Sequence, residues 1–494
     1  MPVADLCPDV YFRRVKVISG LRAKCPGWYI ITAPRECNHG SPGCSSELAM
    51  AIRRRTAFIL VVIAAVFLVA LFFVVSVFTN LDRYRPEIIS YLQEKTGSPV
   101  EIGRLTLALS PSLSIRVDDL GLKNPSIFPA GYFLKVPHVY AEIDAGALLR
   151  RQIVIKSLTL EDPIVNLISD PDGLWNFENP APSRASSAPF SLGVISRVEI
   201  RGGRLLVSNL IDPSDAPGPI FFEARNISSI LQHVDLGAFL DPSSSSVAAQ
   251  GGLKADSLRF GAIQATNVQA KLRLQGKQVF FAGAKLNVYG GRATGNLSFN
   301  LAGQNTAFIT HAQMNGVDVA HLLAAFPYGR GKMTGKMEGN LKLAGEIEHT
   351  YDPLAGIYGT GRLTVRNGEL PSLRLNVNLI KLAHFNDLGP ARQDPSSFSS
   401  VAADLELANL RISSREINIA GYGVDVQSSG SVRVTGAGSL DYQGVAQIVS
   451  KQGFFTNLVA RMSGASLKNG KLSFPFKVSG TMDNPTFSLQ KNTH

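Results

Sequence analysis

The feature that most constrains this chain is one long apolar run near its N-terminus, over residues 57–78. The run contains no charged residue, and its one hydroxyl is that of Ser76. As an α-helix it would span about 33 Å, which is enough to cross a hydrocarbon core of about 30 Å. The apolar core of a cleaved secretory signal is shorter, at about 7–15 residues. We therefore predict an uncleaved transmembrane anchor, whose principal apolar residues are Ala57, Phe58, Leu60, Phe67, Leu71, Phe72 and Phe78.

Three arginines, Arg53, Arg54 and Arg55, directly precede this run. Because basic residues stay on the cytoplasmic side, they predict a single-pass protein with a cytoplasmic N-terminus. In a Gram-negative cell the anchor would lie in the inner membrane and the bulk of the chain in the periplasm. Met50 followed by the arginines resembles a translation start. Residues 1–49 are therefore either a disordered tail or a segment upstream of the true start, and residues 50–80 form the basic flank and anchor.

Charge and cysteine usage exclude several classes of protein. The chain of 494 residues has a net charge of +11, but beyond the anchor the excess is spread thinly, without the clustered Lys and Arg of a nucleic-acid binder. We expect no nucleic-acid partner. All four cysteines lie within the first 44 residues, so the exported part has no disulfide framework. Their spacing fits no standard zinc site.

Beyond the anchor the hydrophobic pattern has mostly the period of β-strands. Residues 81–95 first predict a short helix, with Pro86 in its first turn and Gly97 as its stop. From Val100 apolar residues alternate with polar or small ones, which is typical of half-buried strands. We expect an N-terminal region over residues 81–180, helix then β, and a repeated β-region over residues 190–494.

A repeat with an offset of forty residues supports this organisation. Apolar positions between residues 155 and 167 align with those between 195 and 207, and the turn at Asp162 and Pro163 aligns with Gly202 and Gly203. Each unit is interpreted as a hairpin of two alternating strands. Repetition of hairpins predicts a mainly β fold: an elongated, curved antiparallel sheet that forms a groove, with a few short helices.

No pattern of catalytic residues emerges from the sequence. The chain has no phosphate-binding loop, no dinucleotide-binding glycine motif and no nucleophile elbow. Its eight histidines are scattered rather than paired at metal-ligand spacing. We therefore expect no catalytic, metal or cofactor residues, no cofactor, and no enzymatic activity.

The sequence does predict a large apolar surface. A long sheet with one apolar face must cover that face with a second sheet or helices, or bend into a trough that holds an apolar ligand. Few helices are predicted, so a trough for lipid acyl chains is one interpretation, and ordinary core packing is the other. The candidate residues for the groove face come from the forty-residue repeat: Leu158, Leu160, Val165, Leu167, Val198, Ile200, Leu205 and Val207.

Six short motifs, taken in order, resemble those of the AsmA family. They are Leu81–Pro86 directly after the apolar run, Thr96–Val100, Asp172–Phe177 with its DG-x-x-N pattern, the YGGR of Tyr289–Arg292, Gly361–Gly368 and Phe474–Thr481. The resemblance covers about residues 52–489. The glycines of the YGGR motif are those of a turn, since glycine permits φ > 0.

The resemblance implies a function that the residues alone do not. AsmA-like proteins are anchored in the inner membrane, project a curved β-groove into the periplasm, and resemble bridge-like lipid transfer proteins. It implies a lipid-binding protein that transfers phospholipid between the inner and outer membranes in outer-membrane biogenesis, with membrane lipids and other cell-envelope proteins as partners. The alternative is an anchored scaffold for outer-membrane protein assembly.

The length of the sheet can also be estimated. At about twelve residues per strand, turns included, the chain would form about thirty strands, and at about 4.8 Å between strands the sheet would extend over about 140 Å.

Overall fold

The computed structural model describes most of the chain beyond residue 84. The described residues are 62–69, 82, 85–108, 114–144, 154–178, 194–211, 218–235, 238, 246–326, 329–349, 355–375, 378–379, 397–433, 438–449, 465–469 and 471–490. The chain divides into two compact units, Met1–Phe73 and Val74–His494, which are treated separately.

The predicted anchor falls mostly outside the described residues. Residues 62–69 form a helix with exposed side chains, Phe67 among them. Ala57, Phe58, Leu60, Leu71, Phe72, Phe78 and the arginines Arg53, Arg54 and Arg55 lie outside the described residues. Within the part of the chain that the structure describes, no helix is both long enough and apolar enough to span a membrane.

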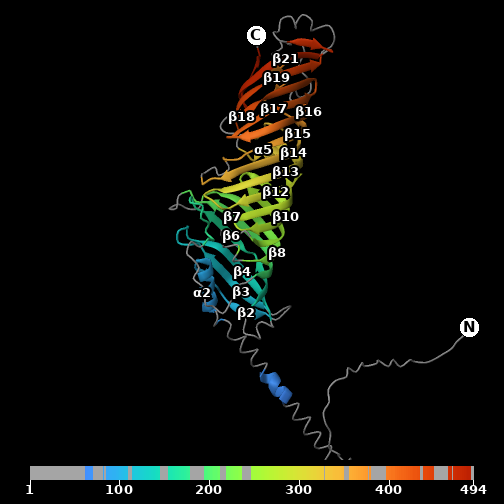
Figure 1. Cartoon of the computed structure of the whole chain (residues 1–494). Coiled ribbons are helices and arrows are strands. Elements are labelled where there is room, and N and C mark those ends of the chain that lie inside the picture. Colours follow the sequence, from blue (N-terminus) through green and yellow to red (C-terminus); the bar gives the residue numbers. More distant parts are fainter. Residues whose placement is uncertain are drawn as a thin grey trace, which may run out of the picture. The chain divides into compact units, whose positions relative to one another are not determined.

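The second unit is one large β-sheet whose strands follow one another along the chain (Figure 1). The first half contains β1 (Val100–Glu101), β2 (Leu105–Ala108), β3 (Ser114–Lys123), β4 (Tyr132–Ile143), β5 (Ile155–Glu161), β6 (Ile164–Ser169), β7 (Ile195–Asn209), β8 (Ile220–Val234), β9 (Val247–Phe260), β10 (Ile263–Gln275) and β11 (Gln278–Val288). The second half contains β12 (Gly291–Asn300), β13 (Thr306–Asp318), β14 (Lys336–Ile347), β15 (Tyr358–Glu369), β16 (Ser397–Ala408), β17 (Arg411–Gly421), β18 (Val424–Arg433), β19 (Ser439–Val449), β20 (Ser466–Lys468), β21 (Lys471–Thr481) and β22 (Pro485–Leu489).

Two short helices accompany the sheet among the described residues of this unit. The predicted helix after the apolar run is α2 (Arg85–Thr96), and it packs Ile88, Ile89 and Leu92 on the apolar residues of β1–β3. The second, α5 (Val319–Ala324), begins at Asp318, whose carboxylate accepts a hydrogen bond from the His321 backbone N–H. Mainly β architecture with few helices is therefore confirmed.

The sheet is mixed rather than wholly antiparallel, and the predicted hairpins are wrong. Strands β5 and β6 are two parts of one interrupted strand, and both pair with β7 in parallel. The partners are residues forty apart: Leu158 lies beside Val198, and Leu167 beside Val207. The repeat in the sequence is thus the register of a parallel ladder. Alternation alone is the same in either case, because side chains alternate in parallel and antiparallel strands alike.

The sheet is also shorter than the sequence suggests. The described residues form 22 strands, and three pairs of these (β1 with β2, β5 with β6, β20 with β22) share one place in the ladder, which leaves 19 rungs. At about 4.8 Å between strands, 19 rungs extend over about 90 Å. Individual strands are longer than expected, reaching 15 residues in β7 and β8, so fewer of them fit into the chain.

A seam of irregular residues crosses the strands of the first half. At each of these positions the backbone has φ between about 49° and 69°, which bulges the strand: Asp119, Asp162, Gly202, Asn226, Asn267 and Gly283. Asp, Asn and Gly tolerate this left-handed conformation better than other residues. At Gly202 φ is +69° and a Cβ would lie 2.1 Å from Asp162 Oδ1, so a larger residue would be strained and would have to displace the Asp162 carboxylate. Successive bulges increase the local twist, so this part of the sheet coils.

Cross-strand ion pairs cover the polar face. The most buried carboxylate is Glu223, whose side chain is 7% exposed and is contacted by Arg204, Arg225 and Arg259. Hydrogen bonds from Arg225, and also from Arg204, hold the pKa of Glu223 at about 2, although burial opposes this shift. One carboxylate thus joins three neighbouring strands, β7, β8 and β9.

We predict that Glu223→Gln lowers thermal stability at neutral pH, and that this difference disappears in acid. The pKa of Glu223 falls from 4.5 to about 2 on folding, so its stabilising effect is complete above about pH 4.5 and is lost as the pH falls toward 2. Melting temperatures of both proteins between pH 7 and pH 2 test this. Asp404→Asn, which removes an exposed partner of Arg362, is the control and should change the melting temperature little, because an exposed ion pair contributes little to stability. A pH-independent difference for Glu223→Gln would contradict the prediction.

Candidate functional site

One uninterrupted line of uncharged residues runs across the whole sheet on one face. Residues that pair across strands share a face, so this line can be followed through the register of every ladder. It consists of Leu107, Ile115, Ala141, Leu158, Val198, Leu231, Gly251, Leu272, Phe281, Leu297, Thr310, Leu343, Gly359, Leu407, Ile412, Val432, Leu440, Gly480 and Pro485. It contains one residue from each rung and no charge. We call the surface around it the apolar face.

The opposite face of the same strands is polar. A parallel line through β11–β17 reads Lys285, Thr294, Gln313, Asn340, Arg362, Asp404 and Glu416. Arg362 and Asp404 form a direct ion pair at 2.7 Å. The sheet therefore separates apolar from charged side chains over its length, as expected when one face meets water and the other does not.

The side chains of the apolar face are only half-buried along β10–β17. Leu272, Leu297, Leu343, Leu407 and Ile412 are all of intermediate exposure. Glycines between them keep the surface low: at Gly359 a Cβ would lie 2.9 Å from Leu343 Cδ2, so the leucine leans over the glycine. A half-exposed apolar face of this extent is typical of a surface that receives an apolar ligand.

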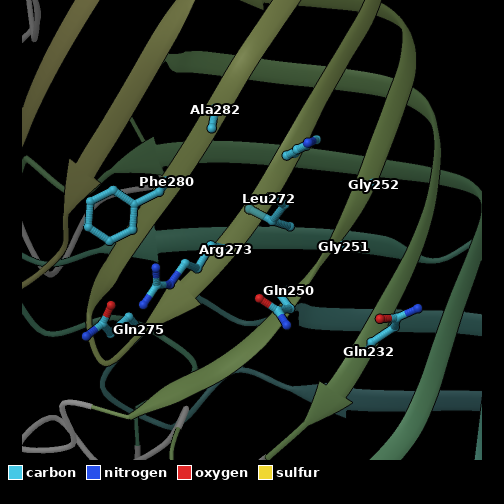
Figure 2. Close-up of a pocket in the computed structure, with 10 residues that line it drawn as sticks. Gln232, Gln250, Gly251, Gly252, Leu272, Arg273, Gln275, Phe280 and Ala282 are labelled. Carbon is cyan, nitrogen blue, oxygen red and sulfur yellow. The ribbon is translucent and has the colours of Figure 1, made fainter.

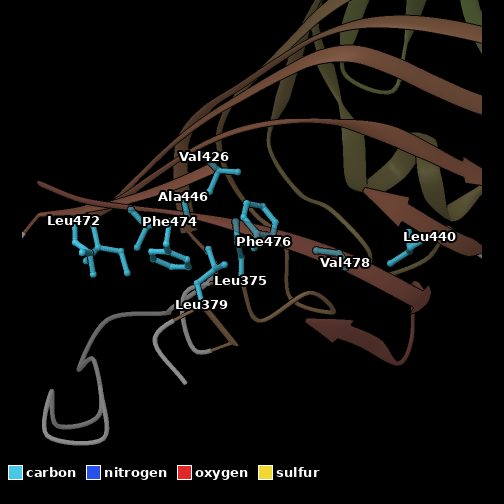
Figure 3. Packing of buried hydrophobic residues seen from close by; sticks show 11 residues of the cluster. Leu375, Leu379, Val426, Leu440, Ala446, Leu472, Phe474, Phe476 and Val478 are labelled. Atoms are coloured by element: carbon cyan, nitrogen blue, oxygen red, sulfur yellow. The ribbon is translucent and has the colours of Figure 1, made fainter. Parts of the chain in front are cut away.

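The protein covers its own apolar face in two further places, one in the C-terminal part beyond the open section and one beside α5, within β11–β16. In the C-terminal part, Leu375 and Leu379 pack beside Phe474 and Phe476 of β21, and Figure 3 shows these side chains gathered together. Phe474 and Leu379 are fully buried. Beside α5, Val319 packs with Val317 of β13 and Met337 of β14, at one end of these two strands. These regions are ordinary core and leave little space for a ligand.

In the first half, an aromatic cluster joins strands that are distant in the ladder. Trp175 is 2% exposed and packs with Val207, Phe221, Phe308 and Ile347. Val207 and Phe221 lie on β7 and β8, whereas Phe308 and Ile347 lie on β13 and β14, and Trp175 lies in the loop after β6. The coiling of the sheet brings these two groups of strands together. They are joined by packed side chains and not by a hydrogen-bonded ladder.

Polar contacts secure the same junction, which we call the clasp (residues 169–178 against residues 303–305, 348 and 349). Ser169 Oγ lies 3.0 Å from His349 Nε2, and Asn209 Nδ2 donates to the Glu348 carbonyl at 2.9 Å. Glu178 pairs with Lys277 at 2.6 Å. Burial lowers the pKa of the His349 imidazole, so the neutral ring is favoured at this contact.

The DG-x-x-N motif builds the clasp loop. Asn176 is fully buried, and its side-chain amide contacts the Ile168 N–H, the Asn166 carbonyl and Asn124 Oδ1. Gly173 has φ +82°, and a Cβ there would lie 2.1 Å from the Gly303 carbonyl oxygen. The motif therefore fixes the loop to β6 and allows the backbone to approach the β12–β13 turn.

The YGGR motif forms a turn, in agreement with the sequence interpretation. Tyr289 and Gly290 have positive φ and connect β11 to β12. The Tyr289 hydroxyl accepts a hydrogen bond from the Gln264 N–H and donates to the Ala262 carbonyl, so it ties this turn to the β9–β10 turn.

The eight candidate groove residues lie side by side in four parallel pairs. Leu158 and Val198 pack with Leu231 of β8 and Ala249 of β9, and Val198 is buried. Leu167, Leu205 and Val207 contribute to the aromatic cluster beneath the clasp. Leu160, Val165 and Ile200 are half-buried. The residues of the open section in β10–β17 were not among the candidates, although the alternation of leucines with Lys342 and with Glu406 was a usable signal.

Among the described residues, no three His, Cys, Asp or Glu side chains gather as a metal site would require. The arrangement can bind an apolar ligand, because one face of the sheet is apolar and the opposite face is charged. The fold and this surface define a β-sheet protein with one long apolar face. A model of the AsmA family matches residues 52–209 of the chain. No curated protein matches the chain.

We predict that Gly173→Val opens the clasp. A β-branched side chain there is strained at φ +82° and collides with the Gly303 carbonyl, so Trp175 should become exposed to water. The chain has two tryptophans, and replacing Trp28 by Phe leaves Trp175 as the single fluorophore. In that background Gly173→Val should shift the emission to the red and increase quenching by iodide. Gly252→Ala, at a glycine with open space around it, should leave both unchanged.

Proposed function

We propose that this protein is a membrane-anchored, periplasmic lipid-binding protein that transfers phospholipid between the inner and outer membranes. The observation that carries the proposal is the uninterrupted uncharged line across all 19 rungs, half-exposed along β10–β17. The match of residues 52–209 to the AsmA family model supports it, since the fold fits a bridge-like lipid carrier or a cell-envelope protein.

In this mechanism acyl chains lie along the apolar face while head groups stay in water. Burying apolar surface contributes about 25 cal/mol per Å², so a lipid chain gains by leaving water for this surface. The side chains vary little in polarity along the line, so successive positions are similar in free energy and a lipid can move from one rung to the next. No reacting group is needed, and we propose no enzymatic activity and no cofactor.

The anchor completes the proposal. A span over residues 57–78 with Arg53–Arg55 on the cytoplasmic side would place the sheet in the periplasm. Six residues separate Phe78 from the start of α2 at Arg85, so the chain between them can extend over at most about 25 Å. The N-terminal strands would then lie close to the inner membrane, where lipid is collected. A sheet of about 90 Å favours delivery to a partner protein at its other end.

We predict that two aspartates on the open apolar face remove bound lipid. Leu341 and Leu405 are half-buried and flank Gly361 on neighbouring strands. In Leu341→Asp/Leu405→Asp, two carboxylates would lie where acyl chains pass, and we expect most of the phospholipid that co-purifies with the full chain to be lost. Mass spectrometry of lipid per chain is the measurement.

The matched control places the same charges on the polar face. Thr294→Asp/Thr360→Asp changes two exposed threonines of the polar face, on β12 and β15, and should retain lipid. A wild-type chain that is well folded and free of lipid would refute the proposal. The apolar face would then be internal core, and the protein an anchored scaffold in outer-membrane protein assembly.

The anchor has its own test. Deletion of residues 57–78 should release the protein from membranes washed with alkaline carbonate, whereas the full chain should stay in the pellet. In intact cells, protease should cleave the chain beyond residue 80 only after the outer membrane is permeabilised. Cleavage in spheroplasts confined to residues before 57 would contradict the proposed orientation.

A further inference from the structure

The polar face carries a hollow that the apolar face does not explain (Figure 2). It lies over β8–β11 and has a volume of about 640 Å³. Figure 2 shows Arg273 and Phe280 on one side of it and Gln250 and Gln232 on the other. These four residues form one cross-strand row, Gln232–Gln250–Arg273–Phe280, so they project from the same face.

Small residues make the hollow. In the adjacent row Lys271 pairs with Gly252 on one side and Ala282 on the other. A Cβ built on Gly252 would meet no atom within 4 Å, and the backbone there needs no glycine for its φ. The absence of a side chain at Gly252 therefore leaves empty space that a ligand can occupy.

The charges of the hollow are uncompensated by protein. On the same face Arg362 faces Asp404 across the ladder and forms an ion pair with it. Arg273 instead lies between Gln250 and Phe280, and Lys271 between Gly252 and Ala282. Within the described part of the chain, neither cation has an ion-pair partner. Two positive charges and three carboxamides, those of Gln232, Gln250 and Gln275, thus line one hollow beside an aromatic ring.

We propose that this hollow binds a phosphorylated saccharide. A guanidinium and an ammonium suit phosphate oxygens, the amides of Gln232 and Gln250 can donate to and accept from sugar hydroxyls, and the Phe280 ring offers an apolar surface to a sugar ring. The volume lies within the usual range of small-molecule sites. The site is on the face opposite to the proposed lipid surface, so it does not depend on lipid transfer.

The test uses the full chain in detergent micelles and isothermal titration calorimetry. Glucose 1-phosphate is the probe, and glucose and inorganic phosphate represent its two halves. We expect saturable binding of glucose 1-phosphate that is tighter than binding of either half. Arg273→Gln should weaken it by at least about tenfold, because a charged hydrogen-bond donor is lost.

A second variant fills the hollow. Gly252→Glu places a side chain in open space, where its carboxylate can pair with Lys271 and Arg273, and it should abolish binding without lowering the melting temperature. Gly252→Ala adds only a methyl group and should bind as the wild type does. Lys285→Gln removes a cation of the same face outside the hollow and should have no effect.

Three outcomes would overturn the proposal. The first is no saturable binding of glucose 1-phosphate by the wild-type chain. The second is binding that survives both Gly252→Glu and Arg273→Gln, since the ligand would then lie elsewhere. The third is inorganic phosphate binding as tightly as glucose 1-phosphate, which would define a simple anion site without a saccharide component.

Discussion

The structure depends on the register of one continuous β-ladder. Each strand pairs with its neighbours so that a residue and its partners share a face, and a slip of one residue would move every apolar side chain to the charged side. The uncharged line from Leu107 to Pro485 exists only because this register holds through 19 rungs. Carboxylate and guanidinium pairs such as Arg362–Asp404 reinforce the same register from the other face.

The seam of bulges determines how the ladder is used. Without positive φ at residues such as Asp162, Asn226 and Asn267 the strands would remain flatter, and the ends of β7 and β13 would not meet. Their meeting creates the clasp, in which Trp175 covers the apolar face together with Phe308 and Ile347, while the uncharged line stays half-exposed along β10–β17. The same sheet thus contains ordinary core and ligand-accessible surface, and the difference lies in what covers each section rather than in composition.

Glycine has two distinct roles on the two faces. On the apolar face Gly359 lets Leu343 lean across the neighbouring strand, which keeps that surface low and continuous. On the polar face Gly252 leaves a hollow between amides and cations that no side chain of the protein fills. Substitution at these two positions therefore has different consequences: Gly359 faces backbone atoms of β14, whereas Gly252 faces open space.

The sequence by itself determined the β architecture, the first helix and the YGGR turn, because alternation, capping residues and glycine act locally. Its short motifs also resemble those of the AsmA family, whose model matches residues 52–209. It did not determine that residues forty apart pair in parallel, since hairpins and parallel strands share one alternation pattern. The clasp was equally hidden, because Asn176 and His349 meet their partners only after the sheet coils. Which apolar residues stay open was decided by tertiary structure, since burial depends on what packs above each residue and not on the residue alone.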